Sequence, residues 1–358
     1  MMSKKILNFL TALILLPALC WADVINIKQD APQRYVVQKG DTLWDISKMY
    51  LDKPWLWPEL WRTNVHIQNP HLIYPGDELL LRQNEQGEMV LELSRQEAKT
   101  VIKMSPQGSK LVKEPDPIPA LPWSVIKPFI EDDQIMQQVD YERHPYILGN
   151  QDGSVLFASN NLTLSKASRS YQSNFKVLRK QNEIYDLSGN FIGLQIRHVA
   201  NAEAVDAELD NQRLVKIEDA NYEVKRGDRL VPDENKSPDS IMLSAAQEQR
   251  GYIIDDLEQH RLLGKYNVVI IDLGAEQVSA GMVMGIYTNG PNIIDDEKPK
   301  YKGENNPMAN AFIMDSDIIQ PALKIGEVIV FKVFEKASYA LITKSSKVIK
   351  RGAIVAKP

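Results

Sequence analysis

The chain has 358 residues, of which 44% are hydrophobic and 25% are charged, the composition of an ordinary globular protein with room for two or three domains. Its 42 basic and 47 acidic residues give a net charge of -5 at pH 7, so electrostatics gives no reason to expect a nucleic-acid partner. A weakly acidic protein accommodates a neutral partner, such as a glycan, more easily than a phosphate or an anionic lipid.

The segment Met1–Ala22 has the three regions of a secretory signal peptide. Two lysines precede an apolar run from Ile6 to Leu19, and the segment ends in Cys-Trp-Ala. The run is shorter than the roughly 20 residues of a membrane-spanning helix, and the pattern at its end favours cleavage after Ala22. We therefore expect a periplasmic protein with no membrane span after cleavage. The alternative is that Cys20, the only cysteine, carries a lipid, although Leu19 stands where lipoprotein signals prefer a small residue.

Residues 34–82 predict a strand, two helices and a second strand. The run Arg-Tyr-Val-Val-Gln is typical of a strand, and Thr42 with Asp45 three residues later has the pattern of a helix N-cap. Pro58 is preorganised for the first turn of a second helix. In Tyr74–Asp77, proline and glycine occupy the two central positions of a type II turn, which leads into the closing strand.

Two stretches of this segment, Tyr35–Ile46 and Asn69–Leu79, resemble the opening and closing patterns of the LysM family. The resemblance implies a βααβ fold that binds polymers containing N-acetylglucosamine, in bacteria chiefly peptidoglycan. It places the ligand in a shallow groove between the first strand-helix loop and the second helix-strand loop. The glycan-binding residues expected on this basis are Gly40, Asp41, Thr42, Leu43, Asn69, Pro70, His71, Leu72 and Ile73.

Such loops can bind an acetylated sugar without an acid or a base. Gly40 permits close approach of the backbone, so main-chain amides could hydrogen-bond the acetamido group. The side chains of Leu43, Leu72 and Ile73 are expected to contact its methyl group. A tight turn and a helix start also explain Gly40 and Asp41, and for Asp41 we favour that structural role.

Four of the six tryptophans lie in this segment, at positions 44, 55, 57 and 61. A module of about 48 residues without disulfides is near the lower limit for independent stability, so it needs large aromatic side chains in its core. Core packing is therefore favoured over sugar stacking, with Trp55 and Trp57 the best candidates for exposure. Residues 51–57 lengthen the connection between the two helices and could extend or partly cover the groove.

Beyond this segment the sequence is mainly β in pattern. Residues 83–104 are expected to form a short β extension. Six prolines between residues 105 and 128 predict an extended linker that tethers the N-terminal module. Short runs rich in Val, Ile and Tyr, punctuated by Gly, Asn and Asp, then predict two β-rich domains at residues 146–232 and 250–358.

A weak internal repeat relates these two domains. In each, an Ile-Gly pair opens a strand-like run that ends in Lys-Arg-Gly, at residues 225–227 and 350–352. A hairpin turn with glycine at positive φ explains that ending without a ligand. Residues 289–316 are polar and contain three prolines, which predicts a long mobile loop. The expected fold class is α+β, an N-terminal βααβ module followed by a mainly β C-terminal half.

The sequence predicts no catalytic residue, no metal site and no cofactor. Once Met1–Ala22 is removed, the chain has no cysteine nucleophile, and its five histidines are scattered without a His-Glu-x-x-His motif. Ser-x-x-Lys occurs at Ser124 and Ser173, but the supporting motifs of penicillin-binding enzymes are missing.

The expected function is non-catalytic binding of peptidoglycan glycan strands in the cell envelope. Two alternatives stay open. The β-rich half could bind another envelope protein, which would make the chain an adaptor. A glycosidase needs only two carboxylates roughly 5 to 10 Å apart, and 47 acidic residues leave room for such a pair.

Overall fold

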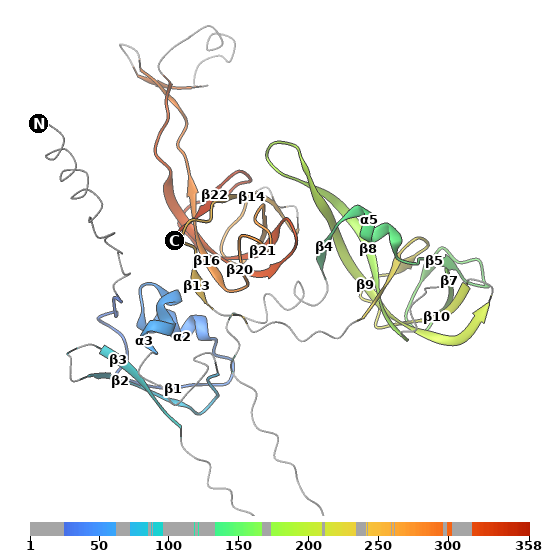
Figure 1. The fold of residues 1–358 in the computed structure, drawn as a ribbon, viewed down its shortest axis with the longest axis horizontal. Coiled ribbons are helices and arrows are strands. Elements are labelled where there is room, and N and C mark those ends of the chain that lie inside the picture. Colours follow the sequence, from blue (N-terminus) through green and yellow to red (C-terminus); the bar gives the residue numbers. More distant parts are fainter. Residues whose placement is uncertain are drawn as a thin grey trace, which may run out of the picture.

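The computed structural model describes residues 25–61, 72–84, 87, 89–95, 118, 121, 133–166, 173–209, 212–233, 241, 243–258, 260, 262–295, 299–302 and 317–358. The signal-like segment lies outside these residues, as does the proline-rich segment apart from Ile118 and Leu121. The chain forms an N-terminal module of helices and antiparallel strands followed by a mostly β C-terminal half, as predicted by the α+β fold class (Figure 1). In the described part of the chain, no helix is long and apolar enough to cross a membrane.

The N-terminal module has the predicted strand-helix-helix-strand order and one additional strand. Its three strands form an antiparallel sheet in the order β1-β2-β3, and Val36 pairs with Glu78. Helix α2 begins directly after Thr42, whose side chain accepts a hydrogen bond from the Asp45 amide, so the N-cap is confirmed. Its elements are β1 (Arg34–Val36), α2 (Leu43–Tyr50), η1 (Pro54–Leu56), α3 (Trp57–Leu60), β2 (Glu78–Gln83) and β3 (Met89–Ser94).

The first β-rich domain, which we call barrel 1, is a sheet that closes on itself. Its strand order is β12-β8-β9-β10-β7-β5, with β4 paired to β9. An isolated bridge between Tyr146 and Arg229 brings the two outer strands together. Its elements are β4 (Gln134–Met136), α5 (Gln138–Arg143), β5 (Ile147–Gly149), β6 (Leu156–Phe157), β7 (Leu162–Lys166), β8 (Asn174–Tyr185), β9 (Phe191–Leu209), β10 (Gln212–Glu218), β11 (Val224–Lys225) and β12 (Arg229–Pro232).

The second β-rich domain, barrel 2, closes more regularly. The order is β16-β20-β21-β15-β14-β22, β22 pairs again with β16, and β13 adds a parallel pairing to β16. The strands are β13 (Ser244–Ala245), β14 (Gly251–Asp256), β15 (Val268–Ile271), β16 (Met282–Thr288), β20 (Leu323–Val333), β21 (Ser338–Ser345) and β22 (Ile354–Ala356). Alternate residues of these strands fill the barrel interior, among them Val269, Ile271 and Ile342.

The two barrels repeat the same connections, which confirms two related β-rich domains. The strands of the two barrels pair with one another in the same pattern. Taken in chain order, the strands that correspond are β5 and β14, β7 and β15, β8 and β16, β9 and β20, β10 and β21, and β12 and β22. The glycine of each Lys-Arg-Gly turn makes the same closing bond. The Gly227 amide donates to the carbonyl of Ile147 at 2.9 Å, and the Gly352 amide donates to that of Ile253 at 2.8 Å.

The segment 289–316, expected as a mobile loop, begins as an extension of the β16–β20 hairpin. Strands β17 (Ile293–Ile294), β18 (Lys300–Tyr301) and β19 (Asp317–Ile318) form a small sheet in the order β18-β17-β19. Residues 296–298 and 303–316 of the expected loop lie outside the described part of the chain. Figure 1 shows this hairpin projecting beyond the body of barrel 2.

The N-terminal module packs directly on barrel 2, although the prolines predicted a tethered module. One apolar cluster runs from the module core, including Trp55 and Trp57, to barrel 2 residues such as Leu243. The ammonium of Lys324 lies 5.8 Å from the centroid of the Trp55 ring, and η1 contacts β13. The difference arises because residues 51–57 supply buried aromatic surface to a second domain, which the local sequence pattern does not reveal.

Candidate functional site

The two loops expected to bind a glycan emerge at the same end of the β1–β2 strand pair. Because these strands are antiparallel, the chain leaves β1 where it enters β2. The Val37 amide donates to the Asp77 carbonyl at 2.9 Å, and the Gly76 amide donates to the Val37 carbonyl at 2.8 Å. These bonds join the base of the 38–42 loop to the turn that closes the second loop.

The first loop is a tight turn that exposes Gly40. Gly40 has φ +102°, and a Cβ there would meet open space. Asp41 fixes the turn, since its carboxylate accepts hydrogen bonds from the Tyr35 hydroxyl at 2.7 Å and from the Gln38 amide at 2.8 Å. Burial, with the hydrogen bond to Asp41 in second place, raises the pKa of Tyr35 to about 12. The carboxylate of Asp41 thus has a structural task.

The second loop ends in the predicted type II turn. The Asp77 amide donates to the Tyr74 carbonyl at 3.0 Å, and Gly76 has φ +98°. The buried carboxylate of Asp77 accepts from the Tyr74 amide and from two guanidinium nitrogens of Arg95, at 2.9 and 2.8 Å. Arg95 also lies 4.8 Å from the centroid of the Tyr74 ring.

Arg95 was missed by sequence reasoning. It follows β3 and supports the second loop by a bidentate charge-assisted contact. The only sequence signal is an arginine at the end of a strand-like run, and nothing local indicates that it reaches back to Asp77. Burial of Asp77 at 3% exposure makes this contact part of the loop's structure.

The expected site residues differ strongly in exposure. Gly40 is exposed, Asp41 is half-buried and Leu72 is 40% exposed, whereas Thr42, Leu43 and Ile73 are buried. The side chains of Leu43 and Ile73 belong to the apolar core, so they present no surface to a sugar methyl group. Asn69, Pro70 and His71 lie outside the described residues.

A residue of the proline-rich segment hydrogen-bonds the described end of the second loop. The Ile118 amide donates to the carbonyl of Ile73 at 2.8 Å. Ile118 and Leu121 are buried in the same cluster as the module core. The carbonyl of Ile73 is therefore already engaged by the protein. Among the described residues of the expected glycan-binding set, Gly40 and Leu72 are the exposed ones.

All four clustered tryptophans are buried, with exposures from 0 to 5%. The expectation of core packing is confirmed, and the suggestion that Trp55 or Trp57 is exposed is wrong. Trp57 and Trp61 stack with ring centroids 5.3 Å apart. Trp55 is covered because it lies at the contact with barrel 2, so sugar stacking on any of the four would require rearrangement.

Two carboxyl groups of barrel 2 have a raised pKa. Burial raises the pKa of Asp255 and of Asp272 in barrel 2. Neither residue lines the hollow of about 710 Å³ on barrel 1 or the crevice of about 130 Å³ between Ile135 and Phe334. Within the described ranges, no group of three His, Cys, Asp or Glu side chains could hold a metal ion.

The N-terminal module matches the LysM domain family over residues 35–82. The chain contains a LysM domain. YqbP, an uncharacterized protein of Bacillus subtilis (strain 168), is 34% identical over 65 residues, which cover 15% of this chain and 30% of that protein. LysM domains bind peptidoglycan and related glycans, and proteins with them are commonly extracellular or associated with the cell envelope. The LysM domain is thus a glycan-binding module.

Proposed function

We propose that this protein binds peptidoglycan glycan strands in the periplasm through its LysM domain and does not cleave them. The observation that carries the proposal is the LysM match over residues 35–82. The common position of both expected loops at one end of β1 and β2 supports it. The signal-like segment Met1–Ala22 supports export.

The exposed first loop and Leu72 are the proposed contact surface. Gly40 lets a sugar approach the backbone, and Leu72 offers an apolar side chain for an acetyl methyl group. Leu43 and Ile73 support the groove from within the core, and Arg95 holds the turn after Leu72. We keep Asn69, Pro70 and His71 in the proposed contact set on the resemblance alone.

The glycosidase alternative has less support. A hydrolase would need two carboxyl groups facing one sugar-binding cleft, whereas Asp255 and Asp272 line neither of the two hollows noted above. Their raised pKa values follow from burial in barrel 2 and need no catalytic explanation.

Co-sedimentation with purified sacculi tests the proposal. The mature protein, which begins at Asp23 after removal of the signal-like segment, is expected to sediment with sacculi and to release no muropeptides. Leu72→Asp places a charge in the apolar part of the groove and should weaken binding by about tenfold or more. The matched control is Val36→Asp, since Val36 is 45% exposed, close to the 40% of Leu72, but lies on the strand β1.

Equal sedimentation of both variants would refute the proposed groove while leaving glycan binding intact. A folded wild-type protein that stays in solution would overturn glycan binding itself. Release of muropeptides by wild type would overturn the proposal that the protein is non-catalytic.

A further inference from the structure

Barrel 1 docks on a defined outer face of barrel 2. Within strand β15, Val269 and Ile271 point into the barrel, whereas Val268 and Ile270 belong to the cluster outside it. Together with Ile254 and Tyr339, these last two form what we call face 2, whose four side chains are at most 6% exposed. The strands of face 2 are β14, β15 and β21.

The hairpin of β8 and β9 packs against this side of barrel 2. Ile184 and Ile192 of the hairpin belong to the same apolar cluster as face 2. The side-chain amide of Gln195 donates to the carbonyl of Leu257, directly after β14, at 3.2 Å. β8 itself contacts β14. A long hairpin of one barrel thus covers an outer face of the next.

The repeat places an equivalent face on barrel 1. Both barrels have a matching loop bond that fixes the correspondence: the Asn160 amide donates to Ile217, as the Tyr266 amide donates to Ile342. Counting along the strands from these positions, Leu164 of barrel 1 corresponds to Ile270 of barrel 2. Their cross-strand partners, Leu214 and Tyr339, correspond in the same way. Face 1 is therefore made of Leu148, Leu162, Leu164 and Leu214.

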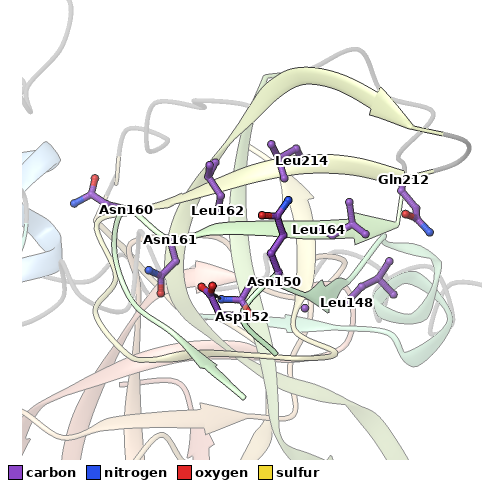
Figure 2. Close-up of a pocket in the computed structure, with 11 residues that line it drawn as sticks. Leu148, Asn150, Asp152, Asn160, Asn161, Leu162, Leu164, Gln212 and Leu214 are labelled. Carbon is purple, nitrogen blue, oxygen red and sulfur yellow. Dashed lines mark hydrogen bonds between the residues drawn. The ribbon is translucent and has the colours of Figure 1, made fainter. Parts of the chain in front are cut away.

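Face 1 is open where face 2 is buried. Leu162 is 50% exposed, and the other three leucines are partly exposed. The four line a hollow of about 710 Å³ together with amide side chains such as Asn150 and Gln212 and with the carboxyl side chain of Asp152 (Figure 2). Figure 1 shows β5, β7 and β10 at the end of barrel 1 that lies away from barrel 2.

Barrel 2 carries a hairpin equivalent to the β8–β9 hairpin of barrel 1. Among the described residues, no outer barrel face packs against the tip of this second hairpin. The β16–β20 hairpin continues into β17 and β19, where Ile293 pairs with Ile318. In barrel 1 the corresponding part of the hairpin carries the buried Ile184. In barrel 2 the two sides of the tip differ: in β17, Ile293 is half-buried and Ile294 is 3% exposed, whereas on the β19 side Ile318 is 48% and Ile319 is 69% exposed. The β19 side of the tip therefore presents exposed apolar side chains in barrel 2, whereas the corresponding part of the hairpin carries a buried side chain in barrel 1.

We propose that copies of this chain associate head to tail, with the β17–β19 tip of one copy seated on face 1 of the next. The occupant is a second copy because the chain presents both halves of an interface that it already forms once internally. Such a contact joins two different surfaces, so it generates a chain or a ring of copies rather than a symmetric pair. Each copy would add one LysM domain to the assembly.

Sedimentation velocity over a wide concentration series tests the proposal on the mature protein beginning at Asp23. Wild type should sediment faster as its concentration rises. Leu162→Asp on face 1 and Ile319→Asp on the tip should each weaken association by about tenfold or more, because a charge enters the apolar contact. The matched control is Met89→Asp, which changes an apolar side chain of similar exposure, 41%, in the LysM domain.

Mixing the two variants gives a sharper readout. Leu162→Asp keeps an intact tip and Ile319→Asp keeps an intact face, so an equal mixture should form dimers that do not grow further. The chain with both substitutions should stay monomeric alone. Far-ultraviolet circular dichroism checks that each variant folds.

A wild type that is monomeric at every concentration would overturn the proposal. So would association that Met89→Asp weakens as much as Leu162→Asp, or a mixture that forms no dimers. If sacculus fragments bind wild type and Leu162→Asp alone removes that binding without affecting self-association, face 1 belongs to a glycan instead.

Discussion

At the scale of single residues, the same Asp–Arg contact stabilises a turn in the LysM domain and a turn in barrel 1. Asp77 and Asp228 each follow a positive-φ glycine and accept a hydrogen bond from a backbone amide of their own turn. Each also binds an arginine through two nitrogens, Arg95 in the first case and Arg179 in the second. In barrel 2 the corresponding residue is Ala353. The clamp therefore stabilises particular loops and is not a requirement of the barrel.

The stability of barrel 1 is expected to vary with pH because of His144. Burial, and then the charge of Arg229, lowers the pKa of His144 below its ordinary value of 6.5, with Asp140 acting in the opposite sense. The unfolded chain binds this proton near pH 6.5, before the folded protein does. The stabilisation that comes from keeping His144 neutral in the folded protein is therefore complete above about pH 6.5. It declines as the pH falls toward the pKa of His144 in the folded protein.

Thermal unfolding at several pH values between neutral and mildly acidic measures this effect. The unfolding midpoint of wild type should fall more steeply below about pH 6.5 than that of His144→Gln, which carries no titrating group. Parallel profiles for the two proteins would show that His144 does not contribute.

At the scale of elements, the two barrels are closed by equivalent turns. Gly227 and Gly352 have φ of +88° and +90°, a region that costs a side-chain-bearing residue strain. Their amides bond to β5 and β14 respectively. The repeated Lys-Arg-Gly sequence is thus explained by backbone conformation and strand closure, as the sequence predicted, without a ligand.

Substitution of Gly352 tests this conformational requirement. A Cβ would meet nothing within 4 Å at either Gly352 or Gly264, but only Gly352 has positive φ. Gly352→Ala should therefore lower the free energy of unfolding by about 1–2 kcal/mol, and Gly264→Ala should change it little or raise it slightly. Chemical denaturation measures both, and an equal loss at the two sites would contradict the argument.

At the scale of the whole molecule, the LysM domain and both barrels share buried apolar surface. The insert between the LysM helices, through Trp55, joins the module to barrel 2, and Gln195 and Lys332 make contacts between the barrels. This packing predicts that the parts unfold together. If copies also associate, several LysM domains act on one glycan network, which compensates for the few contacts of a single shallow groove.

Removal of the Trp55 ring should uncouple the LysM domain from barrel 2. Trp55 is 4% exposed, so Trp55→Ala should cost about 3–5 kcal/mol and split one calorimetric transition into two. Lys324→Ala removes only the cation beside that ring and should cost about 0.5–1 kcal/mol without splitting the transition. Two transitions already present in wild type would contradict the coupling.

The local features of the LysM domain could be predicted because they depend on neighbours in sequence. The Thr42 cap and the Tyr74–Asp77 turn are set by a few consecutive side chains and by glycine's tolerance of positive φ. The relation between the two β-rich domains was also visible, since repeated turns leave a repeated pattern. Each of these caps and turns is determined by residues that are close together in the sequence.

Only the tertiary structure decided which side chains are accessible and what packs on what. Leu43 and Ile73 looked like surface contacts but lie in the core, Arg95 reaches Asp77 from a distant strand, and Trp55 is covered by barrel 2. The same holds for face 1 and face 2, which come from equivalent strands but differ in burial. The sequence by itself determined turns, caps, strand periodicity and the LysM module. Burial depends on surfaces contributed by residues far apart in the chain, and that information exists only once the chain has folded.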